Sequence, residues 1–421
     1  MSAGQKGYRA RVVDAELGNR LRRSGAVLVE GPKGCGKTET SRQLAASELQ
    51  VDIDPRVPGY MEVDPSLMLA GDAPRLLDEW QAQPALWDLV RHAVDERQVK
   101  GQYILTGSSH PVEEARLHSG AGRISRMRMR PMSSVESGFS TGEVSLESLL
   151  SSEGPEPVDK SPDLDGVIGA IVRGGWPTAQ DVSLDDARAQ MRDYVDLLAE
   201  ADAKALGPRR RDPARVALLL QSLARSVATE ASISTIATDV GPERGSLARE
   251  TVVDYLDALT RLMVVEDLPA WPQHLRSSAA LRKAPKRHFV DPALAVAALG
   301  VGPDSLTRDL NFTGQLFESF VVRDLRVYSQ QLDARVFHAR DSYGNEADAI
   351  VQRRDGPWVA VEIKLGPGAV ETAATSLKKF ADSVDVDRAG RCAGLVVITG
   401  WGLAYRRRDG VDVVPFTALG P

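Results

Sequence analysis

The feature that most constrains the fold is a glycine loop, GPKGCGKT, running from Gly31 to Thr38. It follows the apolar run AVLVE (26–30) and precedes a stretch of helical character, TETSRQLAASELQ. This strand–loop–helix context is what the phosphate-loop motif G-x-x-x-x-G-K-[ST] requires. Glycines let the backbone wrap phosphate groups, and the following helix directs the positive end of its dipole at them. The pattern predicts βαβ units and a parallel α/β sheet with the ligand at the carboxyl ends of its strands.

In such a loop, Lys37 would reach the β- and γ-phosphates of ATP, and the Thr38 hydroxyl would hold Mg²⁺. ATP and Mg²⁺ are therefore the predicted cofactors. The predicted nucleotide-contacting residues are Gly31, Pro32, Lys33, Gly34, Cys35, Gly36, Lys37, Thr38, Glu39 and Ser108.

Hydrolysis needs an acid for the metal and a base for the attacking water. The run RLLDEW (75–80) offers Asp78 to the Mg²⁺ shell and Glu79 as the residue that polarises the water. Helix-capping acids give a similar pattern. Farther on, YILTGSS ends at Ser108 and Ser109, where a hydroxyl would sense the γ-phosphate or form a turn.

A basic stretch, GRISRMRMRP, alternates arginines with methionines at Arg126, Arg128 and Arg130. One of these arginines could serve as an arginine finger toward the nucleotide. A strand with one solvated basic face is the other interpretation.

With 421 residues, the chain exceeds one hydrophobic core. A Ser-, Glu-, Gly- and Pro-rich stretch predicts a linker, and the helical text beyond it contains a helix–turn–helix followed by a wing-like extended tail. The predicted parts are an N-terminal α/β domain (1–140), a linker (141–165), a helical and winged-helix domain (166–305) and a C-terminal α/β domain (306–421).

The C-terminal part contains the predicted hairpin ADAIVQRRDGPWVAVEIK (347–364), which carries Asp348 on one arm and Glu362 and Lys364 on the other. A three-residue turn, 355–357, sets Asp348 opposite Lys364, with Glu362 on the same face. A two-residue turn would set Asp348 opposite Ile363, and the acids would diverge. Pro357 cannot donate to the ladder, which favours counting it in the turn. Such acids, with Glu318 upstream, suit a metal-dependent phosphodiesterase centre in which Glu318, Asp348 and Glu362 bind the metal and Lys364 orients water. A solvated strand face is the alternative.

The bulk composition excludes other classes of protein. No apolar run is long enough to span a membrane, and the N-terminus lacks the apolar core of a signal peptide. Two cysteines far apart in sequence suit a reducing cytoplasm. The net charge of −6 argues mildly against a chain dominated by nucleic-acid contacts but leaves room for local basic patches. The expected location is the cytoplasm.

Several stretches together carry a family resemblance. They are YRARVVDAELGNRLRRSGAVLVEGPKGCGKTET, LLDEWQ, YILTGSS, AGRISRMRMRPMSSVESG, RGGWPT, KAPKRHFVDPALA, GQLFESFVVRDL, EADAIV and VAVEIKLG. The chain resembles the bacterial and archaeal AAA-type ATPases that join a phosphate-loop domain to a C-terminal region of long-unassigned function. The resemblance implies nucleotide contacts at Gly31, Gly36, Lys37 and Thr38, with Asp78 and Glu79 as hydrolytic acids. The sequence departs from the family at Trp80, directly after Glu79, where smaller aliphatic residues are common in the family.

The resemblance also implies a winged-helix-like middle and a C-terminal fold like the restriction-endonuclease (PD-(D/E)xK) superfamily. Two functions follow as hypotheses. The first is an ATP-hydrolysing enzyme that acts on duplex or branched DNA, such as repair or recombination intermediates. In this hypothesis the C-terminal residues Asp348, Glu362 and Lys364 could also cleave the DNA with a bound metal. The second is an ATP-dependent switch that binds a protein partner through an inactive nuclease-like domain. Assembly as a homo-oligomer is compatible with both.

Overall fold

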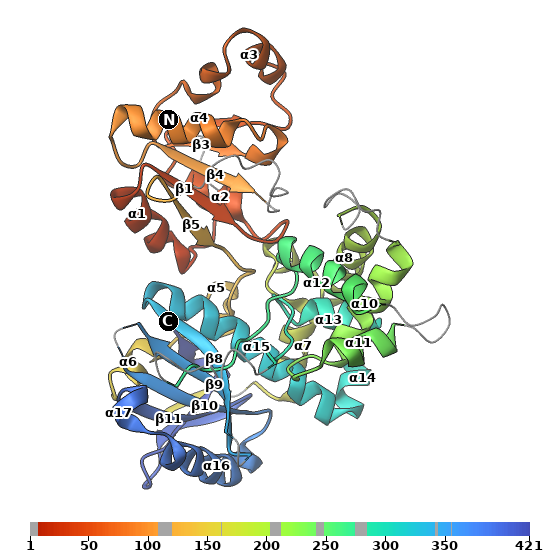
Figure 1. Cartoon of the computed structure of the whole chain (residues 1–421). Coiled ribbons are helices and arrows are strands. Elements are labelled where there is room, and N and C mark those ends of the chain that lie inside the picture. The colour runs from red at the N-terminus through yellow and green to blue at the C-terminus, as the bar shows by residue number, and fades with distance from the viewer. Residues whose placement is uncertain are drawn as a thin grey trace.

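The computed structural model describes residues 7–107, 120–160, 162–202, 212–240, 248–273, 284–341, 344–354 and 356–421. It contains a five-stranded sheet, a helical region and a seven-stranded sheet, arranged as Figure 1 shows. In these described residues, no helix combines the length and the apolar character needed to cross a lipid bilayer.

The five-stranded sheet is built around a strand whose residues are all buried, β1 (Ala26–Glu30). A continuous apolar run of this kind suits a parallel strand covered on both faces. All pairings in the sheet are parallel, in the order β2-β3-β4-β1-β5. The other strands and the helices are β2 (Ser47–Gln50), β3 (Arg75–Asp78), β4 (Tyr103–Gly107), β5 (Ile124–Arg128), α1 (Val13–Arg23), α2 (Lys37–Arg42), α3 (Val57–Val63) and α4 (Leu86–Arg97).

The helix predicted after the glycine loop is shorter than the sequence suggested. α2 ends at Arg42, and Ser47–Gln50 forms β2, which pairs with β3. Leu49 of β2 is buried in the core beneath the sheet, so tertiary burial overrides the helical character of the stretch.

The middle of the chain is helical. α11 (Ile233–Asp239) and α12 (Arg249–Arg261) pack on each other, and the segment after α12 pairs with a later one through bridges Val265↔Phe289 and Leu268↔Lys286. We call residues 264–268 and 286–290 the ribbon. The winged-helix assignment stays a prediction. The remaining helices here are α7 (Leu164–Arg173), α8 (Leu184–Leu197), α10 (Pro213–Arg225), α13 (Ala293–Leu299) and α14 (Pro303–Arg308).

The C-terminal sheet has the order β7-β12-β13-β11-β10-β9-β8, in which the edge strand β7 is Val158–Lys160. The long helix α15 (Leu310–Gln331) packs on β8, β9 and β10, whereas α16 (Val370–Ser383) packs on β9, β10 and β11. Strands β8, β9 and β10 are antiparallel to one another, and the next strand in the sheet, β11, runs parallel to β10. The elements are β8 (Ala334–Arg340), β9 (Glu346–Arg353), β10 (Trp358–Lys364), α17 (Val386–Ala389), β11 (Cys392–Thr399), β12 (Gly402–Arg406), β13 (Asp412–Pro415) and β14 (Leu419–Gly420).

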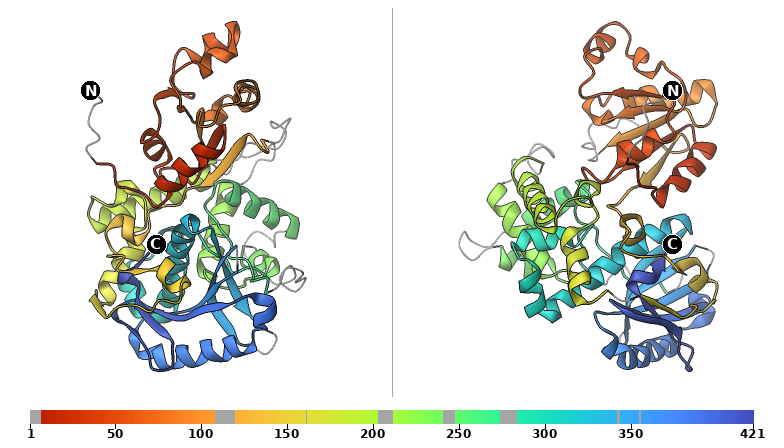
Figure 2. Two further views of the ribbon diagram at one scale, coloured as in Figure 1. Left: turned by 90° about the vertical axis from the view of Figure 1, so that its left-hand side faces the viewer. Right: turned by 180° about the vertical axis from the view of Figure 1, so that it is seen from behind.

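The stretch 141–165, predicted as a linker, is instead largely folded onto the C-terminal sheet. It contains β6 (Val144–Ser145), α6 (Leu146–Leu150) and β7 (Val158–Lys160). β7 pairs with β12, and β6 pairs with β14 at the far end of the chain. This yellow segment lies beside the blue sheet in both views of Figure 2. The buried side chains Leu146, Leu149 and Leu150 explain why a stretch rich in Ser and Glu is held there.

The distribution of apolar cores groups the chain into two bodies. One cluster runs without interruption through the helical region and the C-terminal sheet, including Leu219 of α10, Phe317 of α15 and Val361 of β10. The five-stranded sheet has its own clusters on its two faces, with α1 on one and α4 on the other. The helical region is therefore packed more intimately with the C-terminal sheet than with the N-terminal one.

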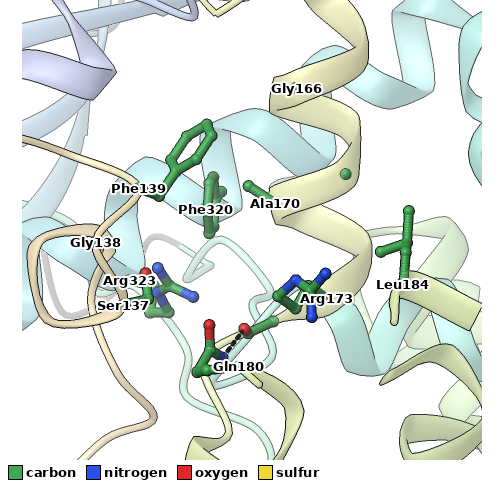
Figure 3. Close-up of a pocket in the computed structure, with 12 residues that line it drawn as sticks. Ser137, Gly138, Phe139, Gly166, Ala170, Arg173, Gln180, Leu184, Phe320 and Arg323 are labelled. Atoms are coloured by element: carbon green, nitrogen blue, oxygen red, sulfur yellow. Dashed lines mark hydrogen bonds between the residues drawn. The ribbon is translucent and has the colours of Figure 1, made fainter. Parts of the chain in front are cut away.

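A buried ion cluster joins these parts near a short helix, α5 (Ser134–Ser137). Arg323 of α15 lies 2.7 Å from both Asp291 and Asp324, and Asp324 accepts a hydrogen bond from the Ser134 backbone N–H. A cavity of about 360 Å³ opens beside it, between α5, α7 and α15 (Figure 3). Its second arginine, Arg173, donates to two backbone carbonyls, so the charges of both arginines are engaged within the protein.

We expect Arg323→Met to lower the free energy of unfolding by about 3–5 kcal/mol, because removing one partner leaves buried carboxylates uncompensated. Urea denaturation measures the change. The matched control is Arg354→Met, which removes the exposed pair with Asp333 and should cost less than about 1 kcal/mol. Equal effects of the two substitutions would contradict the assigned role of the cluster.

Candidate functional site

The glycine loop lies at the carboxyl end of β1, and two of its glycines adopt conformations that other residues avoid. Gly34 has φ 70° and Gly36, which caps α2, has φ 106°. A Cβ on Gly31 would come within 2.3 Å of the Met129 carbonyl oxygen. The loop is thus shaped by a close approach to the segment after β5 as well as by its own glycines.

Lys37 is folded back over the loop. Its side chain is buried, and Nζ donates to the carbonyl oxygens of Gly31 and Pro32, each at 3.0 Å. The ammonium group is therefore positioned inside the loop, where the sequence predicted that it would meet phosphate oxygens.

Thr38 and Asp78, predicted as partners across Mg²⁺, are in direct contact. The Thr38 hydroxyl donates to Asp78 Oδ1 at 2.8 Å, and the buried Thr106 hydroxyl of β4 donates to the same oxygen. Parallel strands β1, β3 and β4 bring the three residues together because their carboxyl ends meet at one edge of the sheet. A hydroxyl and a carboxylate side by side are the oxygen ligands that Mg²⁺ takes in such sites.

Glu79 directly follows β3 in a left-handed backbone conformation, φ 51°. A non-glycine residue in this region is uncommon and costs on the order of 1 kcal/mol or more, which the surrounding structure must compensate. Its carboxylate accepts a hydrogen bond from the Gln81 side chain. Ser108 and Ser109, predicted to sense the γ-phosphate, lie outside the described residues.

The loop is also held by residues far away in sequence. Arg11 donates to the carbonyl of Cys35 at 2.8 Å and pairs with Glu136 at 3.2 Å. The Trp176 indole donates to the Lys33 carbonyl at 3.0 Å. The backbone of the loop is therefore held in part by Arg11 and by the segment around Trp176, and a movement of either would change its position.

A pocket of about 570 Å³ opens beside the loop, between it and α8. Its aromatic wall is formed by Trp176 and Tyr194, whose ring centroids are 5.0 Å apart. It is lined by Lys33, Gly34, Trp176, Thr178, Gln190, Met191, Asp193, Tyr194 and Leu197.

The alternating arginines do not form one solvated face. Arg130 makes a two-pronged contact with Glu266 of the ribbon, at 2.7 and 2.9 Å, and Arg128 lies 3.7 Å from the same carboxylate. Arg126 lies over the Trp87 ring. Two of the three side chains thus join the N-terminal sheet to the ribbon, and the arginine-finger prediction stays untested.

In the predicted hairpin, the register differs by two residues from the expectation. Trp358 pairs with Gln352 and Val361 with Ala349, so the ladder leads toward Glu362, not Lys364, opposite Asp348. The Pro357 carbonyl accepts a hydrogen bond from the Arg353 N–H, which places Pro357 at the end of the arm instead of in the turn. A shift of two keeps every side chain on its predicted face. Residue 355 lies outside the described residues.

The acids of the hairpin converge with Glu318 of α15 in a largely buried cluster, but around two lysines. Lys286 Nζ lies 2.6 Å from Glu318 and 3.4 Å from Asp348. Lys364 Nζ lies 2.8 Å from Glu362 and 3.6 Å from Asp348. Three carboxylates thus share two ammonium groups; we call these five side chains the acid–lysine cluster.

Two of the three carboxylates, those of Glu318 and Glu362, have raised pKa values. Burial raises the pKa of Glu318 to about 8 and that of Glu362 to about 7, and the negative charge of Asp348 adds to both shifts. Burial alone would lower the pKa of Lys286, but Glu318 and Asp348 raise it above its ordinary value. Lys286 is therefore held as a cation among acids that resist ionisation.

The predicted metal ligands Glu318, Asp348 and Glu362 lie in one cluster, and their binding of a metal stays a prediction. Within the described residues, no group of three or more His, Cys, Asp or Glu side chains is arranged to hold an ion. The physical reason is that the two ammonium groups lie among the carboxylates. One observation does fit a further cation: Oε2 of the buried Glu362 has no hydrogen-bond partner among these residues.

Sequence reasoning missed four residues that shape these sites: Arg11, Thr106, Trp176 and Lys286. Thr106 could have been found, because it precedes the serines at the end of a strand already predicted to flank the nucleotide. Lys286 was visible only as part of a basic stretch, since its partners lie 32 and 62 residues away.

Comparison with protein families assigns the first part of the chain. An "AAA domain" matches residues 23–137, which contain the loop, Asp78 and Glu79. Two families described as "Domain of unknown function", DUF8612 and DUF4143, match residues 165–305 and 313–419. The N-terminal part thus has an AAA-like phosphate-loop fold within a mixed α/β chain.

Similar whole proteins exist in mycobacteria. The uncharacterized proteins Mb2031c of Mycobacterium bovis and Rv2008c of Mycobacterium tuberculosis are each 27% identical over 407 residues, covering 95% of this chain and 82% of theirs. Among solved structures, the Walker-type ATPase PABY2304 of Pyrococcus abyssi is 14% identical and covers 71% of this chain and 99% of its own, with a TM-score of 0.42. That score is too low to define a shared fold.

We expect Trp176→Phe to weaken binding of a fluorescent ATP analogue by about fivefold, because it removes a hydrogen bond worth about 1 kcal/mol to the loop while keeping an aromatic side chain there. Equilibrium titration measures the affinity. The matched control is Trp271→Phe, which removes an indole hydrogen bond to Gln352, remote from the loop. Unchanged affinity in Trp176→Phe would remove this contact from nucleotide binding.

Proposed function

We propose that this chain binds and hydrolyses ATP with Mg²⁺. The observation that carries the proposal is the convergence of Lys37, Thr38 and Asp78 at one edge of the parallel sheet. Lys37 would neutralise the β- and γ-phosphates, and the Thr38 and Asp78 oxygens would hold Mg²⁺. Bound Mg²⁺ would supply charge neutralisation for phosphoryl transfer.

Glu79 is the proposed base in this reaction. It lies next to Asp78 at the same strand end, and its unusual backbone conformation turns the chain sharply after β3. There its carboxylate would accept the proton of the attacking water. Ser108 would contact the γ-phosphate.

We expect Glu79→Gln to reduce kcat at least about 100-fold while leaving ATP affinity unchanged, because a general base contributes 10²–10⁴-fold to the rate and little to binding. Lys37→Ala should lose both, since it removes a phosphate contact. Phosphate release and equilibrium binding measure the two effects. Glu96→Gln, an exposed acid on α4, is the control and should behave as wild type. Normal turnover in Glu79→Gln would exclude Glu79 as the base.

For the whole chain we propose an ATP-driven enzyme acting on duplex or branched DNA. The proposal is supported by the contacts of Lys364 with both Asp348 and Glu362, the three hairpin residues predicted for a metal-dependent phosphodiesterase centre. Asp348 and Glu362 would hold a divalent metal and Lys364 would orient water for phosphodiester cleavage. ATP hydrolysis would move the N-terminal domain against the other body.

The second candidate is an ATP-dependent switch that binds a protein partner. The observation that favours it is the acid–lysine cluster, in which Lys286 and Lys364 already neutralise the carboxylates that cleavage would need. In that case the C-terminal domain would serve for binding alone.

The two candidates differ in their response to DNA. For the first, duplex or branched DNA should raise the ATPase rate, and Asp348→Ala should abolish Mg²⁺-dependent cleavage while sparing ATPase activity. Glu371→Ala, at an exposed ion pair, is the control. Steady-state ATPase assays and cleavage of labelled DNA measure both effects. If no form of DNA raises the ATPase rate and none is cleaved, the first candidate is excluded and the protein-binding switch is favoured.

A further inference from the structure

Lys286 reaches the acid–lysine cluster from outside the C-terminal sheet. It belongs to the ribbon, where its N–H donates to the Leu268 carbonyl and its carbonyl accepts from the Leu268 N–H. Its side chain is only 14% exposed and ends between Glu318 and Asp348. The ribbon, which lies outside the sheet, therefore places the Lys286 ammonium group between the carboxylates of Glu318 and Asp348.

The carboxylates retain capacity for a stronger cation. Asp348 Oδ2 accepts a hydrogen bond from the Ile363 N–H, which fixes its orientation toward β10. Oε2 of Glu362 is buried without a hydrogen-bond partner among the described residues. A buried carboxylate oxygen without a partner is less stable than one that accepts a hydrogen bond or binds a cation. A single ammonium group offers one charge and at most three donors, whereas a divalent cation accepts six or more oxygen ligands.

We propose that Lys286 is a built-in cation that occupies the position of a divalent metal, so that the metal binds Asp348, Glu362 and Glu318 only when Lys286 is displaced. This inference rests on the proposed metal chemistry of the C-terminal domain. It assigns to Lys286 the control of metal binding and no contact with the reacting atoms.

The ribbon is also held at a second point, which gives Lys286 a means of displacement. Glu266, whose N–H donates to the His288 carbonyl, is gripped by Arg130 of the N-terminal domain. Arg130 directly follows Met129, whose carbonyl oxygen lies against Gly31 of the phosphate loop. A shift of the N-terminal domain therefore acts on the same short element that carries Lys286.

The test is a Mn²⁺ titration of the nucleotide-free full-length protein, with free Mn²⁺ measured by electron paramagnetic resonance. Without nucleotide, the phosphate loop contributes little to the binding. We expect Lys286→Met to bind Mn²⁺ at least about tenfold more tightly than wild type, because the competing charge is gone. Lys286→Arg keeps the cation and should match wild type. The double variant Lys286→Met/Asp348→Asn should lose the gain.

If Lys286→Met is unstable, Lys286→Gln provides a second neutral variant, because its side-chain amide can still donate a hydrogen bond to Glu318. Thermal unfolding with and without Mn²⁺ gives an independent measure of binding. Equal Mn²⁺ affinity in wild type and both neutral variants would overturn the role of Lys286. So would a gain that survives Asp348→Asn, because the metal would then lie elsewhere. ATP turnover, measured on the same preparations, reports separately on the N-terminal site.

Discussion

The arrangement of this protein depends on one largely buried carboxylate, that of Glu266, whose side chain is 14% exposed. Burial works to raise its pKa, but Arg128, Arg130 and Arg326 together hold the pKa well below its ordinary value. Arg128 ends β5 of the N-terminal sheet, Arg130 lies just after it, and Arg326 belongs to α15, whereas Glu266 belongs to the ribbon. A buried ion group of this kind contributes little net stability, yet breaking it is costly, so it fixes the parts in one geometry.

Around this anchor the two chemical sites differ in how they are built. The phosphate loop is local, because Gly31, Lys37 and Thr38 lie within one strand–loop–helix unit. Asp78 joins them at the end of β3, which is separated from β1 by the single strand β4. The acid–lysine cluster is assembled from α15, two hairpin arms and the ribbon. The first site is specified by a short piece of sequence, whereas the second exists only when distant segments have packed.

This difference explains what sequence could predict. The loop, the strand that ends at Asp78 and the two arms of the hairpin follow from motif and hydrophobic pattern, which are local properties. The hairpin register depended on whether Pro357 belongs to the turn, and the structure places it at the end of an arm. Lys286, Trp176 and Arg11 act through contacts with distant residues, which no spacing rule encodes. β2 and the folded stretch 141–160 were missed because burial outweighed local composition.

The folded stretch 141–160 has a practical consequence for dissecting this chain. The polypeptide leaves the N-terminal sheet, lays β6 and β7 into the C-terminal body, crosses the helical region and only then builds β8 to β14. A fragment that starts at residue 306 would lack β7 and leave the edge of β12 unpaired, and it would also lose the ribbon that carries Lys286. Unpaired edges invite self-association. A cut near residue 140 separates the N-terminal sheet without removing any strand from the C-terminal sheet.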